Sequence, residues 1–269
     1  MSPTPKTKSS QLLDDAREKY HSGTRNDFEL RQLLKRSEVE IQRDPHDANA
    51  NCANFIVLSM MKRSADTVAS VRTALSRVIG DDHRYYVFKN GLKALMNVAA
   101  FDEHFRVVDE IWSKFPDSKE LAKEVAGHAF LTGRFGLALE ADARLRKLSP
   151  EEGLPFASGL VKLNDFLFQK GIAESQVIPV AESFLEAIGK YTDRISESSV
   201  VVSPWLVDPD GGSYSEMLFL PDISSAQCVD VLCDAFDILE AKGADSVPLE
   251  LLTFDIRNVI KKKTNAVPA

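Results

Sequence analysis

The chain has 269 residues, which is enough for two small domains, and 44% of them are hydrophobic, which is enough for a substantial core. No apolar run approaches the ~18 residues of a membrane span, and the first ten residues lack the apolar segment of a secretory signal. The net charge of −7 argues against sequence-independent nucleic-acid binding. Three cysteines are too few for a disulfide framework and indicate a reducing compartment, so we expect a cytoplasmic protein.

The charge is unevenly distributed along the chain. Residues 1–43 hold nine Lys/Arg and seven Asp/Glu, which leaves this segment close to neutral. Residues 197–260 hold two Lys/Arg and twelve Asp/Glu, a local charge of −10. This asymmetry indicates an acidic surface in the C-terminal part of the chain and favours a basic partner.

The N-terminal segment predicts a short lead-in and then a helix. Residues 1–12 are rich in Pro, Ser, Thr and Lys, which bury little apolar surface, so we predict a disordered lead-in. Residues 28–41 have helical periodicity and are expected to cover the first unit of the region that follows.

Helix-breaking residues recur at a nearly constant interval. They stand at Asp44-Pro45, Gly80–Asp82, Pro116-Asp117 and Ser149-Pro150, with spacings of 36, 35 and 34 residues. Such spacing is typical of repeated helix-turn-helix units.

The third unit has the clearest pattern. Residues 119–132 have apolar residues at helical spacing, and three positions follow that suit a closely packed pair of helices. We expect Gly133 to permit a tight turn, Phe135 to fill the space between the helices, and Ala138 to let them approach closely. The segment from Leu131 to Pro150 resembles a tetratricopeptide repeat.

The resemblance covers about residues 45–150. In the second unit Gly91, Ala99 and Phe101 fall near the expected places, but His104 stands where a small residue belongs; the first unit keeps little besides amphipathicity. The resemblance implies a right-handed stack of antiparallel helix pairs. A further pair is predicted over residues 154–170 and 174–191, broken at Gly171.

The pattern changes near residue 195. Residues 200–207 and 214–220 predict two strands of a β-hairpin with its turn at 208–212, followed by a helix over 224–242 and a strand over 249–254. Three strands and one helix make a small core, so we expect this module to pack on the last helices.

The predicted fold class is therefore mostly α, with a TPR-like α-solenoid of antiparallel helix pairs followed by a small α+β module. The predicted domains are a lead-in (1–12), a helical repeat domain (13–195), an acidic α+β module (196–262) and a flexible tail (263–269).

The first candidate site is a groove lined by alternate helices. Alignment of the repeat units places Asn54, Lys89 and Lys123 in equivalent positions, with Asn90 and Lys93 close to Lys89. A row of Lys and Asn suits a peptide carboxylate or an acidic side chain. The alternative interpretation is an ordinary face of solvated lysines.

The second candidate site is the helix over residues 224–242. Asp230, Asp234 and Asp237 are spaced i, i+4 and i+7, so they form one stripe. The opposite, apolar stripe is predicted to be buried, both cysteines of the helix included (Val229, Leu232, Cys233, Phe236, Leu239, and Cys228). The acidic stripe predicts a docking face for a basic partner; the alternative is a solvated acidic face.

These features favour a protein-protein interaction function, as an adaptor, a chaperone-like factor or an inhibitor. The partner is expected to be a protein that is basic or that presents an acidic tail; nucleic acid is the least favoured, and self-association stays open. The sequence has no metal, nucleotide or nucleophile motif, so no cofactor is predicted. The alternative is an enzyme or enzyme subunit whose C-terminal module uses Asp208, Asp210 and Asp222 as acid-base or metal groups.

Overall fold

The computed structural model describes residues 7–22, 26–153, 157–192, 195, 199–201, 214–220, 224–243 and 252–258. The chain divides into two compact units, residues 1–121 and 122–269, and the boundary between them falls inside one helix. No helix in the described ranges is long and apolar enough to cross a bilayer. The predicted domain limits, with a boundary near residue 195, stay a prediction.

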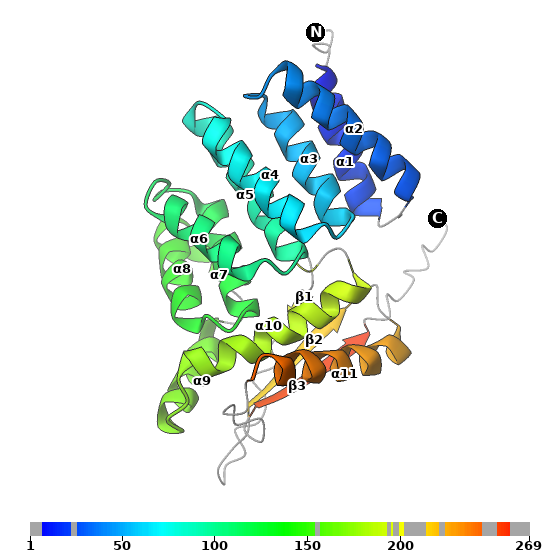
Figure 1. Ribbon diagram of the computed structural model, residues 1–269. Helices are drawn as coiled ribbons and strands as arrows, with labels where there is room; N and C mark the ends of the chain where they lie inside the picture. Colours follow the sequence, from blue (N-terminus) through cyan, green and yellow to red (C-terminus); the bar gives the residue numbers. More distant parts are fainter. Residues whose placement is uncertain are drawn as a thin grey trace, which may run out of the picture. The chain divides into compact units, whose positions relative to one another are not determined.

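The first unit is a helical bundle arranged around one buried helix (Figure 1, blue to blue-green). Its helices are α1 (Lys8–Ser22), α2 (Asp27–Arg43), α3 (Ala48–Met60), α4 (Ser64–Arg77), α5 (Asp81–Asn97) and α6 (Phe101–Trp112). Helix α3 packs against α1, α2, α4 and α5. This central position follows from its sequence, because α3 is apolar or small on almost all sides and such a helix is stable only when it is enclosed.

Helix α1 begins inside the stretch predicted as a lead-in. It starts at Lys8 and buries Leu12, Leu13 and Ala16. Residues 1–6 lie outside the described residues. The short apolar cluster of α1 is enough for a helix because α3 supplies the surface on which it packs.

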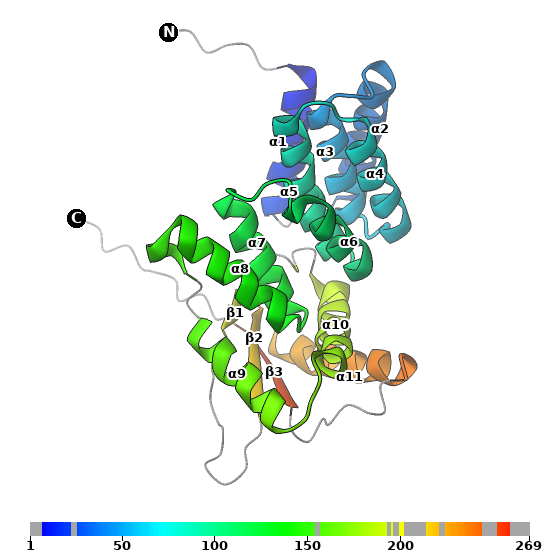
Figure 2. The ribbon, with the colours of Figure 1, turned by 90° about the vertical axis from the view of Figure 1, so that its left-hand side faces the viewer.

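The second unit continues with helices (Figure 2, green to orange). They are α7 (Lys119–Leu131), which contains the boundary between the units, α8 (Phe135–Leu148), the 3-10 turn η1 (Pro150–Glu152), α9 (Ala157–Gln169), α10 (Glu174–Tyr191) and α11 (Ser225–Ala241). A capping box forms at the start of α11, where the backbone N–H of Gln227 donates to Ser224 Oγ at 3.3 Å and the backbone N–H of Ser224 donates to Gln227 Oε1 at 2.9 Å. The predicted helix breaks at residues 44–45, 80–82, 116–117 and 149–150 all fall between helices or at their ends.

The same tight turn joins the two helices of four successive pairs. In each turn one residue has positive φ, and the next residue's N–H donates to the carbonyl five residues earlier, which is a Schellman motif. The residues with positive φ are Lys62 (55°), Ala99 (54°), Gly133 (75°) and Gly171 (67°). The described helices therefore follow one another as helix-turn-helix pairs, which is compatible with the predicted helical repeat. The assignment to the tetratricopeptide class stays a prediction.

The expected roles of the third unit's residues are confirmed. Gly133 has the positive φ of the turn, and a Cβ there would lie 3.3 Å from the backbone of Ile178. Phe135 is buried with its ring centroid 5.9 Å from that of Phe130, and Ala138 is fully buried. In the second unit of the repeat, His104 is also fully buried, with its Nδ1 3.0 Å from the carbonyl oxygen of Leu92. A histidine replaces the small residue there because the backbone supplies a polar partner for the ring.

The predicted fold class is wrong at the C-terminus. The helix assigned to a separate module of β-hairpin, helix and strand, α11, belongs instead to the same compact unit as α8–α10 and packs along α10 (Figure 1), and most of the described residues are helical. Strand β1 is described over Ser199–Val201, and the rest of the predicted strand, 202–207, and the turn predicted at 208–212 lie outside the described residues. Strand β2 (Tyr214–Leu220) pairs antiparallel with β1 but parallel with β3 (Leu252–Asn258), in the order β1-β2-β3. The physical reason is that so few strands cannot bury the apolar stripe of α11, whereas α10 can.

Candidate protein-binding surfaces

Asn54, the first residue of the predicted groove, is part of the interior of the first unit. Its side chain is only 7% exposed. Its Nδ2 donates to Ser37 Oγ on α2 at 3.1 Å, and its Oδ1 accepts from Ser70 Oγ on α4 at 2.7 Å. Asn54 therefore connects three helices, and both halves of its amide are satisfied within the chain.

A groove lies between α2 and α4, and Asn54 and Ser70 are part of its lining. Its volume is about 380 Å³, and its lining comes from α2, α3, α4 and the α3–α4 turn (Glu38, Ile41, Gln42, Asn51, Asn54, Leu58, Arg63, Asp66, Ala69, Ser70, Thr73). The lining is mixed in charge, with Arg63 bonded to Asp66 at 2.7 Å. Nothing in this lining selects a cationic or an anionic partner.

Lys89 and Asn90, which the sequence analysis assigned to the predicted groove, lie next to each other on α5 and are not part of the α2–α4 groove. Both side chains are half-buried. Asn90 accepts from Arg17 at 3.1 Å and donates to the carbonyl oxygen of Tyr86 at 2.7 Å, and the Arg17 guanidinium lies 5.2 Å from the Tyr86 ring centroid. Asn90 thus positions α1 against α5.

The remaining lysines of the predicted groove belong to different units. Lys93 is half-buried on α5 in the first unit, and Lys123 is exposed on α7 in the second. The use of Lys89, Lys93 and Lys123 as one binding row stays a prediction.

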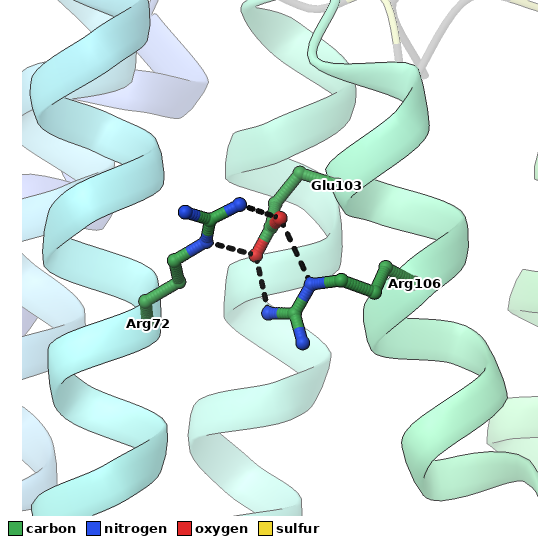
Figure 3. A network of polar contacts seen from close by, with 3 residues as sticks. All are labelled: Arg72, Glu103 and Arg106. Atoms are coloured by element: carbon green, nitrogen blue, oxygen red, sulfur yellow. Dashed lines mark hydrogen bonds and ion pairs between the residues drawn. The ribbon is translucent and has the colours of Figure 1, made fainter.

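An ionic cluster that the sequence patterns do not indicate joins α4 to α6. Figure 3 shows Glu103 between two guanidinium groups. Arg72 donates to both carboxylate oxygens, at 2.8 and 2.5 Å, and Arg106 donates to both, at 3.0 and 2.6 Å. The carboxylate is 7% exposed, and the hydrogen bonds from Arg72 and then Arg106 lower the pKa of Glu103 to about 2. With four donors on two oxygens, Glu103 is saturated and has a structural role.

The buried stripe of α11 differs from the predicted one. The buried residues are Cys228, Val231, Ala235 and Leu239, so of the residues predicted to be buried only Cys228 and Leu239 are. The stripe is displaced by one residue, which is about 100° around the helix axis. Small side chains at two of these positions allow α10 to approach α11 closely, and that close approach selects the face.

The predicted acidic stripe has two kinds of carboxylate. Asp234 is held by α10, because Lys190 Nζ lies 3.1 Å from its Oδ1 and the Tyr191 hydroxyl donates to its Oδ2 at 3.1 Å. Burial, together with this bond to a carboxylate, raises the pKa of Tyr191. Asp230 and Asp237 are exposed, and no basic side chain among the described residues forms an ion pair with either. The use of these three residues as a docking stripe stays a prediction.

The displacement exposes apolar side chains that were expected to be buried. Val229 is 60% exposed and Phe236 is 49% exposed, and Cys233 is exposed between them. These residues are spaced i, i+4 and i+7, so they form a continuous second stripe beside the acidic one. Phe236 is anchored on one side by an edge-to-face contact with Phe184 of α10, at 6.0 Å between ring centroids. We call Val229, Cys233 and Phe236, with Asp230 and Asp237, the α11 face.

The sequence contained a signal for this surface. Apolar residues in α11 occupy more than half of the helix circumference, which is more than one packing partner covers.

No group of three or more potential metal ligands occurs in the described part of the chain. Cys52 is fully buried, and burial raises the pKa of its thiol. The carboxylates of the enzyme hypothesis, Asp208, Asp210 and Asp222, lie outside the described residues.

Comparison with protein-family models, with curated proteins and with solved structures finds no match for this chain.

Proposed function

We propose that this chain is a protein-interaction protein of the tetratricopeptide kind that binds a basic, amphipathic surface of a protein partner through the α11 face. The observation that carries the proposal is the exposed apolar stripe of α11 beside two carboxylates for which the described part of the chain supplies no counter-ion. The repeated Schellman turns and the Gly133–Phe135–Ala138 packing support the assignment to the repeat class. The cytoplasmic localisation stays a prediction.

The two halves of the α11 face have different roles in binding. Burial of the exposed parts of Val229 and Phe236 would contribute about 1 kcal/mol each to affinity. Asp230 and Asp237 would mainly accelerate the encounter with a basic partner and disfavour acidic ones. Helix α11 contains four carboxylates and no basic residue, so every charge on it acts in the same direction.

The test is a fluorescence anisotropy titration of the full chain against a labelled amphipathic helical peptide with Leu at i, i+4 and i+7 and Lys on the flanks. A peptide with Glu in place of Lys is the charge control. We expect Asp230→Lys/Asp237→Lys and Val229→Ser/Phe236→Ser each to raise the Kd about tenfold or more.

A matched control comes from helix α9 of the same unit. Phe168 is 86% exposed and Asp165 is exposed, so Phe168→Ser and Asp165→Lys change an aromatic residue and a charge outside the α11 face. These variants should bind like the wild type. Equal binding of the Lys and Glu peptides, or equal effects of the α9 and α11 variants, would contradict the proposal.

A further inference from the structure

A second groove, unlike the first in charge, lies between α1 and α2. Its volume is about 570 Å³. Its lining comes from one side of each helix (Lys8, Gln11, Leu12, Gln32, Lys35, Arg36, Val39, Glu40). We call it the α1–α2 groove.

The groove combines an apolar strip with a cationic rim. Leu12 is buried at its base and Val39 is 53% exposed beside it. Lys8 and Lys35 are exposed, and within the described residues neither forms an ion pair. An acidic segment with its own apolar stripe is therefore the complementary ligand.

The charged residues around the rim leave this cationic character in place. Arg36 is bonded to Asp15 at 3.1 Å, and Glu40, the one carboxylate in the lining, lies 3.8 Å from Arg43. Each of these carboxylates thus already has its own arginine. The unneutralised charge of the groove comes from the two lysines.

The chain itself contains a segment with the complementary chemistry. The α11 face has exposed apolar residues at helical spacing beside two carboxylates that pair with no basic side chain of the described residues, and α11 is 17 residues long. A helix that packs into the groove between two others is a common mode of helix association. We infer that the α11 face of one copy binds the α1–α2 groove of a second copy of this chain.

This inference rests on the proposed function, because it names the partner of the α11 face. The two surfaces differ, so the contact is heterologous and further copies can add in the same way until a ring closes. A single helix in one groove is a small interface, so we expect reversible association that depends on concentration and weakens with salt.

The experiment is sedimentation velocity of the full chain over about 1–200 µM, with two charge-reversed variants. The groove variant is Lys8→Glu/Lys35→Glu, which leaves the Arg36–Asp15 bond in place. The face variant is Asp230→Lys/Asp237→Lys. We expect each alone to weaken self-association about tenfold or more.

An equimolar mixture of the two variants should associate again. The unchanged face of the groove variant meets the unchanged groove of the face variant, and the two reversed surfaces are also complementary. The control variant, Lys147→Glu/Lys162→Glu, makes the same charge change at exposed lysines outside the groove and should self-associate like the wild type.

Three results would overturn the inference. The first is a wild-type chain that stays monomeric over the whole range; peptide binding to the α11 face then tests the proposed function separately. The second is self-association that neither variant weakens. The third is a change in sedimentation with the charge reversals that does not depend on concentration, which would mean that the two surfaces meet within one chain.

Discussion

The α4–α6 joint and the α11 face use carboxylates in opposite ways. At the joint, Glu103 is nearly buried and accepts four hydrogen bonds from two arginines. On α11, Asp230 and Asp237 are exposed beside apolar residues and no described basic side chain pairs with them. A carboxylate that is saturated inside the chain contributes to stability, whereas one left beside an exposed apolar stripe is available to a partner.

The largest expected effect is on the joint. Glu103→Ala removes the shared acceptor of Arg72 and Arg106 and leaves two like charges close together, so we expect a loss of about 2–3 kcal/mol in the free energy of unfolding, measured with urea. Glu110→Ala is the matched control on the same helix, since Glu110 is partly exposed and its ion pair is with Lys114 at 3.2 Å. Glu110→Ala should lower the free energy of unfolding by less than about 0.5 kcal/mol. Similar losses for both variants would contradict the claim that Glu103, with its two arginines, stabilises the chain more than a partly exposed ion pair does.

The polar connection of α2, α3 and α4 should have a somewhat smaller effect. Asn54→Leu leaves the hydroxyl groups of Ser37 and Ser70 without their amide partner, and we expect a loss of about 1–2 kcal/mol in the free energy of unfolding. The control is Asn49→Leu, at a half-buried position of α3. It should change the free energy of unfolding by less than about 0.5 kcal/mol. If Asn54→Leu binds the basic peptide as the wild type does, the two regions act independently.

The contribution of Glu103 should depend on pH in one direction. Its pKa is lowered from 4.5 to about 2, so its stabilising effect is complete above the unfolded value and is lost as pH falls toward 2. The difference in unfolding free energy between the wild type and Glu103→Gln should therefore fall by more than half between pH 7 and about pH 3. Urea titrations at the two pH values measure this, and a difference that stays constant or grows at low pH would contradict the ionic role.

The smallest effect is expected within the acidic stripe itself. Asp230→Asn/Asp237→Asn should raise the free energy of unfolding by about 0.2–0.5 kcal/mol, because it relieves like-charge repulsion along α11. Asp234→Asn is the control and should lower it by about 0.5–1 kcal/mol, since Asp234 is bonded to Lys190 and Tyr191. Thermal unfolding of the wild type and the two variants measures whether each change raises or lowers the stability. A uniform loss would mean that all three carboxylates are structural.

The repeat units were predictable because their signals are local. Gly133 and Gly171 mark turns by themselves, and the limits of α10 match the predicted range of 174–191. The equivalent turns at Lys62 and Ala99 use residues with a Cβ, so no glycine indicated them. Their positive φ is maintained by the packing of the helices on either side.

The candidate site was only partly predictable. The acidic stripe of α11 was located correctly on the helix, but the exposed residues Val229, Cys233 and Phe236 were assigned to the core. Both possible apolar stripes of α11 satisfy helical periodicity, and periodicity alone does not choose between them. Asn54 was assigned to the groove because its repeat position matches Lys89, although its two serine partners are 17 and 16 residues away along the chain.

By itself, the sequence determined the helix pairs, their turns and the acidity of the C-terminal part, because these depend on residues close together in the chain. Tertiary structure alone decided which stripe of α11 is buried, that Asp234 is bonded to Lys190 and Tyr191, and that Glu103 meets Arg72. Each of these depends on which helix packs beside which, and that choice is made by close packing over the whole unit.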